Sequence, residues 1–161
     1  MNNEVTNSQE IFQIIRSGNT EALTAFIEQH PESINSTNQQ GFTPLIIASY
    51  SNQQDTVKTL LRMGVIINAQ DAAGNTALMG TCFKGYQDMA KLLIEHGADI
   101  NMQNFQGSTA LIFAATFGQV EMVRLLLKKG ANKEIKDQSG STALMYAQNK
   151  GNKPLTDLLS S

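Results

Sequence analysis

Four segments of this chain follow one pattern, which first appears as Gly41-Phe42-Thr43-Pro44-Leu45-Ile46-Ile47-Ala48. The copies recur at a constant interval of thirty-three positions, and the glycine, threonine and leucine keep their places in every copy. These places are occupied by Gly41, Gly74, Gly107 and Gly140, by Thr43, Thr76, Thr109 and Thr142, and by Leu45, Leu78, Leu111 and Leu144. A fixed period of this length indicates stacked copies of one small structural unit.

Each copy predicts two short helices after a tight turn. The glycine suits the backbone of the turn, the threonine two residues later is a suitable N-cap, and Pro44 is tolerated in the first helical turn. The first helix is expected to end near Asn52, Gly85, Gly118 and Gly151, which recur at the same interval. The second helix should end at a glycine in the left-handed conformation. The glycines at that place are Gly64, Gly97 and Gly130.

These segments resemble the ankyrin repeat. Residues 41–48 are similar to that family's G-x-T-P-L-H-x-A motif, and Leu92-Leu93-Ile94-Glu95-His96-Gly97-Ala98-Asp99-Ile100-Asn101 is similar to its L-L-x-x-G-A-D-x-N ending. The resemblance implies an all-α fold, an ankyrin-repeat solenoid of helix-turn-helix units joined by β-turn or hairpin loops. The family's histidine is absent, and we expect an apolar contact in its place. The residues at this position are Ile46, Met79, Ile112 and Met145.

The resemblance extends over residues 8–161, which we expect to form a single domain after a flexible N-terminus at residues 1–7. About five repeats are expected, at approximately residues 8–37, 38–70, 71–103, 104–136 and 137–161. The first unit lacks the Gly-x-Thr turn, and the last ends early, with Ser160 at a place that is apolar in its predecessors. We interpret these two units as capping repeats with polar outer faces, because the ends of a solenoid have no neighbour to cover them.

The composition disfavours several classes of partner and cofactor. The 161 residues carry 12 basic and 14 acidic side chains, so a formal charge of -2 offers no basic excess for nucleic acid or an anionic membrane. One cysteine cannot form an internal disulfide, and two histidines are too few for a typical zinc site. We therefore expect no metal and no cofactor, no nucleic acid or membrane partner, and a monomer. The N-terminal residues lack the features of a secretory signal, which favours a cytoplasmic location and leaves export by another route open.

The sequence also contains none of the common catalytic motifs. There is no G-x-S-x-G elbow, no phosphate-binding loop ending in Gly-Lys-Ser or Gly-Lys-Thr, and no H-E-x-x-H. The constant interval of the repeat assigns the glycines to turns and helix ends. Cys82 falls within a first helix, where its neighbours in phase are mostly small, and we expect a buried, unreactive thiol. The sequence therefore predicts a protein that is not an enzyme.

Charged residues indicate which face of the stack is solvated. Each second helix carries an acidic residue near its start and a basic residue three positions later, an order that stabilises a helix modestly. The pairs are Asp55 with Lys58, Asp88 with Lys91, and Glu121 with Arg124. This repeated pattern is typical of an outer face, and the many Asn and Gln residues are interpreted as further surface and turn residues.

Aromatic residues divide into two groups. Those on apolar helical phases are assigned to the core: Phe12, Phe26, Phe113 and Tyr146. Five others lie elsewhere, with Phe42 and Phe105 beside turn glycines and Tyr50, Phe83 and Phe117 at the ends of first helices. In the ankyrin family these positions line a concave groove that varies with the partner, so the resemblance implies that the five face outward on one side. The alternative, in which some of them fold back onto neighbouring repeats, remains open.

The sequence therefore predicts a module that binds a partner protein through its concave groove, with Phe83 and Phe117 as central anchors. The alternative is an inhibitor, immunity protein or stabilising protein of one specific enzyme, which would use the same contacts. A small-ligand binder would need a closed pocket with convergent polar groups, and no series at the spacing of the repeat supplies one. The residues expected to bind the partner are Phe42, Tyr50, Asn75, Phe83, Lys84, Phe105, Gln106, Ser108, Phe117 and Lys129, and further polar residues of the same surface are Gln39, Gln40, Gln138, Ser141 and Lys150.

Overall fold

The computed structural model describes the backbone of residues 2–160 and the side chains of residues 9–160. Within this part of the chain the regular structure consists of ten α-helices and one short 3₁₀ helix, without strands. The elements are α1 (Asn2–Ser17), α2 (Thr20–Gln29), η1 (Pro31–Asn35), α3 (Pro44–Tyr50), α4 (Gln54–Arg62), α5 (Ala77–Lys84), α6 (Gln87–Glu95), α7 (Ala110–Thr116), α8 (Val120–Lys128), α9 (Ala143–Asn149) and α10 (Lys153–Ser160). The predicted all-α repeat fold is confirmed.

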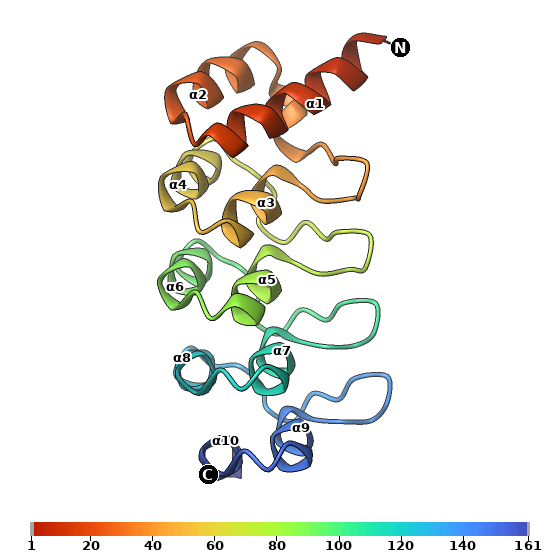
Figure 1. Cartoon of the computed structure of the whole chain (residues 1–161), viewed down its shortest axis with the longest axis vertical. Helices are drawn as coiled ribbons and strands as arrows, with labels where there is room; N and C mark the ends of the chain where they lie inside the picture. Colours follow the sequence, from red (N-terminus) through yellow and green to blue (C-terminus); the bar gives the residue numbers. More distant parts are fainter. Residues whose placement is uncertain (1, 161) are drawn as a thin grey trace.

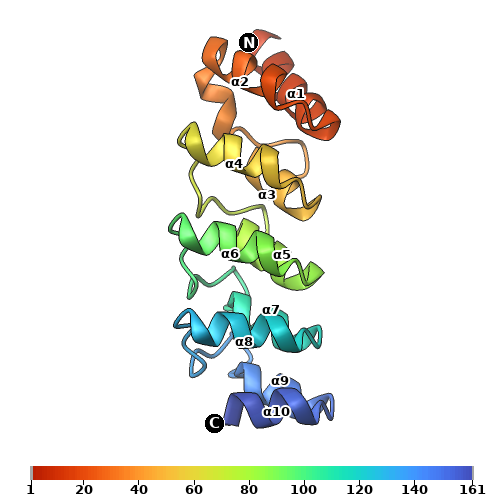
Figure 2. The same ribbon diagram turned by 90° about the vertical axis from the view of Figure 1, so that its left-hand side faces the viewer.

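The helices form a stack of antiparallel pairs (Figure 1). One row contains the second helix of each pair, α2, α4, α6, α8 and α10, and the first helices form a parallel row beside it. Four hairpin loops project from the far side of the first helices, at residues 36–43, 69–76, 102–109 and 135–142. Figure 2 shows the pairs as successive layers along the long axis. No helix between residues 2 and 160 combines the length and the apolar character needed to cross a bilayer.

The predicted helix ends are confirmed residue by residue. The threonine before each of α3, α5, α7 and α9 accepts a hydrogen bond at its Oγ1 from the backbone N–H three residues later, at 3.2 to 3.4 Å. This bond satisfies a donor that the first helical turn leaves unpaired. At the other end of α3, Asn52 adopts a left-handed backbone with φ of 56°, where the later repeats use glycine. Asparagine tolerates this conformation better than most residues, so the turn is kept without a glycine.

The hairpin loops are held by a repeated side chain that the sequence interpretation did not identify. Asn38, Asp71, Asn104 and Asp137 recur at the interval of the turn glycines, and each accepts two backbone N–H bonds, from the residues two and four positions later. Short side chains that bond their own backbone in this way favour turns over regular structure. Each loop therefore has a fixed conformation even though it contains no strand.

Several amides connect one repeat to the next. The Nε2 of Gln70 donates to the carbonyl of Gly74 in its own loop at 2.6 Å and to that of Gln103 in the next at 3.1 Å. Gln103 repeats this arrangement towards Gly107 and Lys136, with the same two distances. The prediction that amides are surface and turn residues is thus incomplete, because these two side chains also link neighbouring loops.

The core lies between the two helix rows and continues through every layer. Phe12 and Phe26 are buried there, as predicted. Phe113 and Tyr146 pack against the core but are only partly buried, which corrects their assignment as core residues. Both residues lie on first helices, α7 and α9, and the residues around them cover their rings only in part. Apolar periodicity marks a helix face and does not measure how completely a neighbour covers it.

The two ends of the stack differ from the middle. Helix α1 begins at Asn2, so its backbone includes residues 2–7, the segment expected to be flexible, and Met1 lies outside the described residues. No glycine or proline interrupts this segment, so helical hydrogen bonding extends through it. At the other end Met145 is 44% exposed, whereas the equivalent Met79 is buried, because no further repeat covers α9.

A candidate protein-binding groove

A groove of about 480 Å³ lies between the first helices and the first two hairpin loops. Helices α3 and α5 supply most of its floor, α7 contributes Phe113, and α1 contributes Arg16 from the preceding layer. The remaining lining comes from the loops, including Phe42, Asp71 and Asn75. The groove therefore crosses four layers of the stack and exists only when these layers are assembled.

The floor of the groove is interrupted at Gly80. Residues at the equivalent place on α3 and α7 are Ile47 and Phe113, and both line the groove. Gly80 has no side chain, and an added Cβ would lie 3.5 Å from Cδ2 of Tyr50, which is ordinary contact. The hollow above Gly80 is therefore bordered by Ile47, Phe113 and the rings at the helix ends.

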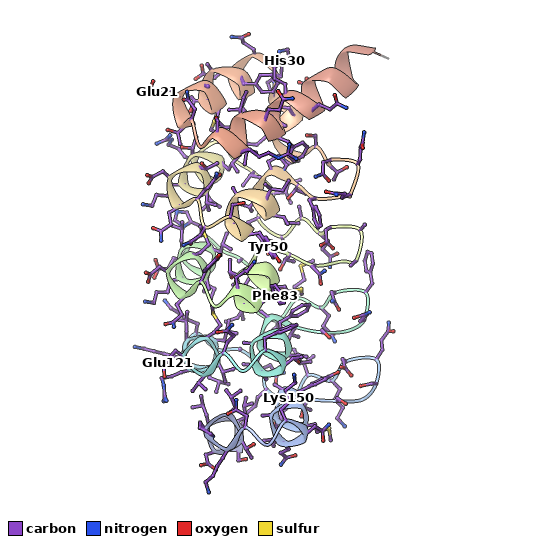
Figure 3. All side chains as sticks on the ribbon, viewed as in Figure 1. Glu21, His30, Tyr50, Phe83, Glu121 and Lys150 are labelled. Atoms are coloured by element: carbon purple, nitrogen blue, oxygen red, sulfur yellow. The ribbon has the colours of Figure 1, made fainter. Side chains whose placement is uncertain are left out.

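Aromatic rings at the ends of the first helices form a continuous row. Tyr50 and Phe83 lie on successive levels (Figure 3), with ring centroids 6.1 Å apart and planes nearly parallel at 7°. Phe83 meets Phe117 edge to face, with centroids 4.6 Å apart. Tyr50 is 43% exposed and Phe117 47% exposed, whereas Phe83 between them is partly buried. Exposed rings held by their neighbours in this way present apolar surface without losing side-chain freedom on binding.

A lysine completes the aromatic row. The Nζ of Lys84 lies 4.4 Å from the centroid of the Tyr50 ring and 5.7 Å from that of Phe83. An ammonium group at this distance is attracted to the negative face of the ring, which positions the charge beside the groove. Lys84 is exposed and forms no ion pair within the described part of the chain.

The polar groups of the groove differ in what they already bind. The Oδ1 of Asp71 accepts bonds from the backbone N–H groups of Ala73 and Asn75, and its Oδ2 accepts one from the Asn75 amide. The Asn75 carbonyl oxygen in turn accepts a bond of 2.8 Å from the Asn104 side chain. These side chains are used to build the loops. Arg16 is exposed, and residues 9–160 provide no ion-pair partner for it.

The structure brings most of the predicted partner-binding residues to one side. Phe42 lines the groove and is partly buried, while Phe105 is 62% exposed on the third loop, with its ring against Gly74 of the second. Both alternatives considered for Phe105 therefore hold in part, because the ring contacts a neighbouring repeat and still faces solvent. Gln106 and Ser108 lie on the same loop, where their backbone N–H groups donate to Asn104.

Lys129 is the predicted residue that the structure does not bring to this side. It caps the C-terminal end of α8, whereas Phe117 lies just before the N-terminal end of the same helix. Its Nζ forms an ion pair with Glu95 at 3.4 Å. A residue after the second helix is separated from the aromatic row by the length of that helix, about 13 Å for nine residues.

The outer face carries the predicted charge pairs. Asp55 with Lys58, Asp88 with Lys91, and Glu121 with Arg124 form ion pairs at 3.6, 3.3 and 3.4 Å. Figure 3 shows Glu121 on the second-helix side, away from Tyr50 and Phe83. These pairs are exposed, so they contribute little to stability and mark the face opposite the groove.

Ten of the fifteen residues that line the groove were not predicted from the sequence to bind a partner, among them Phe113, Gly80 and Arg16. Phe113 was assigned to the core, and Gly80 has no side chain that could contact a partner. Arg16 lies in the first unit, which lacks the Gly-x-Thr turn of the other repeats. The signal for Gly80 was present, because the residues one repeat before and one repeat after it are large and apolar. Arg16 had no such signal, since its approach to the groove depends on how α1 packs.

A metal-binding cluster is not found among the described residues. No group of three or more histidine, cysteine, aspartate or glutamate side chains is placed to hold a metal ion within this part of the chain. Cys82 is 0% exposed, and burial raises the pKa of its thiol from 9.0 to about 12 although a hydrogen bond with Thr81 acts in the opposite direction. A thiol with this pKa is protonated at neutral pH and is a poor nucleophile, as predicted.

A comparison with protein families agrees with the helix pairs, caps and loops described above. A family model described as "Ankyrin repeats (3 copies)" matches residues 11–104 and, a second time, residues 97–161. Together these matches extend over most of the chain, including the irregular first and last units. The chain belongs to the ankyrin repeat family.

Proposed function

We propose that this chain binds a segment of a partner protein in the groove between its first helices and its hairpin loops. Ankyrin repeats are in general protein–protein interaction modules and are typically not enzymes. The observation that carries the proposal for this chain is the row of Tyr50, Phe83 and Phe117, whose outer two rings are nearly half exposed beside the groove. Partly exposed aromatic residues on one face are the residues that most often dominate protein interfaces.

The rigidity of this surface supports binding to a protein segment. The rings contact one another, and the loops opposite are fixed by the bonds to Asp71 and its equivalents. A surface that is already in its binding conformation loses little conformational entropy on association. The side chains of Asp71 and Asn75 are already occupied by bonds within and between the loops, so apolar contact and the charges of Arg16 and Lys84 are the main interactions that the groove offers.

The test is recovery of the partner from an extract of the native cell, using wild type and the double variant Tyr50→Ala, Phe117→Ala. These two rings are chosen because their exposure lets them be truncated with little loss of core packing. We expect the variant to lose the proteins that wild type recovers, because truncating central interface aromatics typically costs about 2 kcal/mol or more.

Ile66→Ala is the matched control. Ile66 is 57% exposed and lies after α4, outside the residues that line the groove. The control should recover the same proteins as wild type. Equal recovery by the double variant and by wild type, quantified by mass spectrometry, would show that the partner does not use the aromatic row.

A small-molecule ligand is distinguished by thermal stability. A metabolite bound to the folded protein raises the melting temperature by mass action. If the groove serves a protein segment, a metabolite panel should leave the melting temperature of wild type unchanged. A metabolite that stabilises wild type but not Tyr50→Ala, Phe117→Ala would contradict the proposal.

A further inference from the structure

We infer that the partner segment is acidic and carries a large apolar side chain that fills the hollow above Gly80. This inference rests on the proposed function and adds the chemical class of the partner. It depends on two independent observations, the missing side chain in the floor of the groove and the unpaired cations at its edge.

The hollow lies where the neighbouring layers each carry a large side chain. In the layers before and after α5, the same position carries Ile47 and Phe113, and these side chains line the groove on either side of Gly80. Met79, which is buried, and Phe83 line the same groove. An apolar side chain that enters this space leaves water and contacts apolar groups on several sides. This burial of apolar surface is the main favourable contribution to binding in such interfaces.

Helix stability does not require a glycine at this place. Gly80 lies inside α5 and does not have a positive φ, so its backbone would accept any ordinary residue. A glycine within a helix costs about 0.5–1 kcal/mol relative to alanine. The added Cβ would meet its nearest neighbour at 3.5 Å, so packing does not exclude a side chain either. The Tyr50 ring lies over part of this position, and the rest of the space above Gly80 is open to a group from outside the chain.

The charges at the groove favour an acidic segment. Arg16 lines the groove and Lys84 lies over the ring of Tyr50, which also lines it. Asp71 is the carboxylate among the lining residues, and both of its oxygens already accept bonds from the loop. The two cations are therefore available to a partner, and the bonds to Asp71 occupy its oxygens without removing its negative charge.

The net negative charge of the chain opposes the binding of an acidic segment only weakly. Charges on the outer face, such as Glu121 with Arg124, are paired there and lie on the second-helix side of the stack. At physiological ionic strength, interactions between exposed charges are screened beyond about 8 Å. A segment in the groove therefore responds chiefly to Arg16, Lys84 and Asp71, whose sum of one positive charge favours carboxylates over further cations.

The test is selection of binders from a random peptide library on the full chain, followed by fluorescence anisotropy with the enriched synthetic peptides. We expect enriched peptides that combine several Asp or Glu with a Leu, Ile, Met or Phe, and a Kd that rises with salt. Gly80→Leu should weaken their binding by about tenfold or more, and Gly80→Ala by less, because each fills the hollow to a different extent. The double variant Arg16→Glu, Lys84→Glu should also weaken binding.

Two matched controls separate the groove from general effects. Ala25→Leu adds the same apolar side chain to the exposed face of α2, and Lys58→Glu reverses a charge on the outer face. Both should bind the peptides as wild type does. Circular dichroism checks that the variants fold. If Gly80→Leu does not fold, the binding of Gly80→Ala still tests the hollow.

Three results would overturn the inference: no enriched peptide, enriched peptides that are neutral or basic, or equal affinity for Gly80→Leu and wild type. Failure here is distinguishable from failure of the proposed function. If neutral or basic peptides are enriched and lose binding with Tyr50→Ala, Phe117→Ala, the groove remains the binding surface and the acidic class is wrong. If no enriched peptide responds to that double variant, the proposed groove function fails as well.

Discussion

Asp137 fixes the last hairpin loop with one carboxylate. Its Oδ1 accepts bonds from the backbone N–H groups of Ser139 and Ser141 and from the Ser139 hydroxyl, and its Oδ2 accepts one of 2.6 Å from the Tyr146 hydroxyl. Burial by itself raises the pKa of this carboxyl, but the four hydrogen bonds outweigh it and lower the pKa from 3.8 to about 2. The ionised form is therefore favoured by folding.

The lowered pKa predicts an acid-dependent loss of stability. A carboxyl whose pKa is lower in the folded state stabilises that state above its unfolded pKa, and this contribution disappears as the pH falls through the folded value. Wild type should therefore exceed Asp137→Asn in stability at pH 6, with the difference shrinking between about pH 4 and 2. Urea unfolding at several pH values measures this.

Tyr146→Phe supplies the control for this prediction. It removes one of the four hydrogen bonds to Asp137, so it should lose only part of the stability that Asp137→Asn loses at pH 6. If the difference in free energy of unfolding between wild type and Asp137→Asn stayed constant down to pH 2, the lowered pKa of Asp137 would be contradicted. Asp137 is only partly buried, so a small effect of ionic strength is also expected.

The loops are the elements that join one repeat to the next on the groove side. Each loop is fixed by its own Asn or Asp, and Gln70 and Gln103 then bond one loop to its neighbour. The helices on the other side contact one another through apolar packing. Hydrogen bonds therefore align the layers on the loop side, and apolar packing aligns them on the helix side.

Removing one of these links should destabilise the stack modestly. Gln103→Ala eliminates the bonds to Gly107 and Lys136, and a net contribution of about 0.5–1.5 kcal/mol is expected for a hydrogen bond of this type. The free energy of unfolding in urea should fall by that order. Gln106→Ala is the matched control, because its exposed side chain lies on the same loop without bonding a neighbouring one. Equal stability of the two variants would argue against the amide links.

The whole molecule is held together by contacts between neighbouring layers. Helix α5 packs against both α3 and α7, whereas α9 packs against α7 on one side and has no layer beyond it. In such a stack, stability depends on each unit and on its interfaces with the units next to it. The final layer is therefore expected to open more readily than the middle.

Thiol labelling tests this gradient. Cys82 lies in the middle layer and is fully buried with a raised pKa, so it should react with a thiol reagent only when its layer opens. Ala147→Cys in a Cys82→Ala background places a thiol in α9, at a position that is also fully buried. The second thiol should react faster. Equal rates for the two proteins would mean that the stack opens as one unit.

Much of this architecture follows from short-range signals. The threonine caps and the terminal glycines act on backbone groups within a few residues, so their spacing alone was sufficient to predict where helices begin and end. The outer charge pairs were equally predictable, since residues three apart on a helix are neighbours. The sequence did not indicate how exposed Phe113 is or on which side of the stack Lys129 lies, because both depend on adjacent layers.

The sequence by itself determined the repeat, its helices and its caps, because these depend on local backbone chemistry at a fixed period. Tertiary structure alone decided how the groove is composed. Arg16 reaches it from α1, Gly80 leaves a hollow only because Ile47 and Phe113 stand on either side, and Tyr50 and Phe117 meet Phe83 across layers. These relations join residues about one repeat or more apart in the chain, and the packing between layers, which no local pattern encodes, sets their distances.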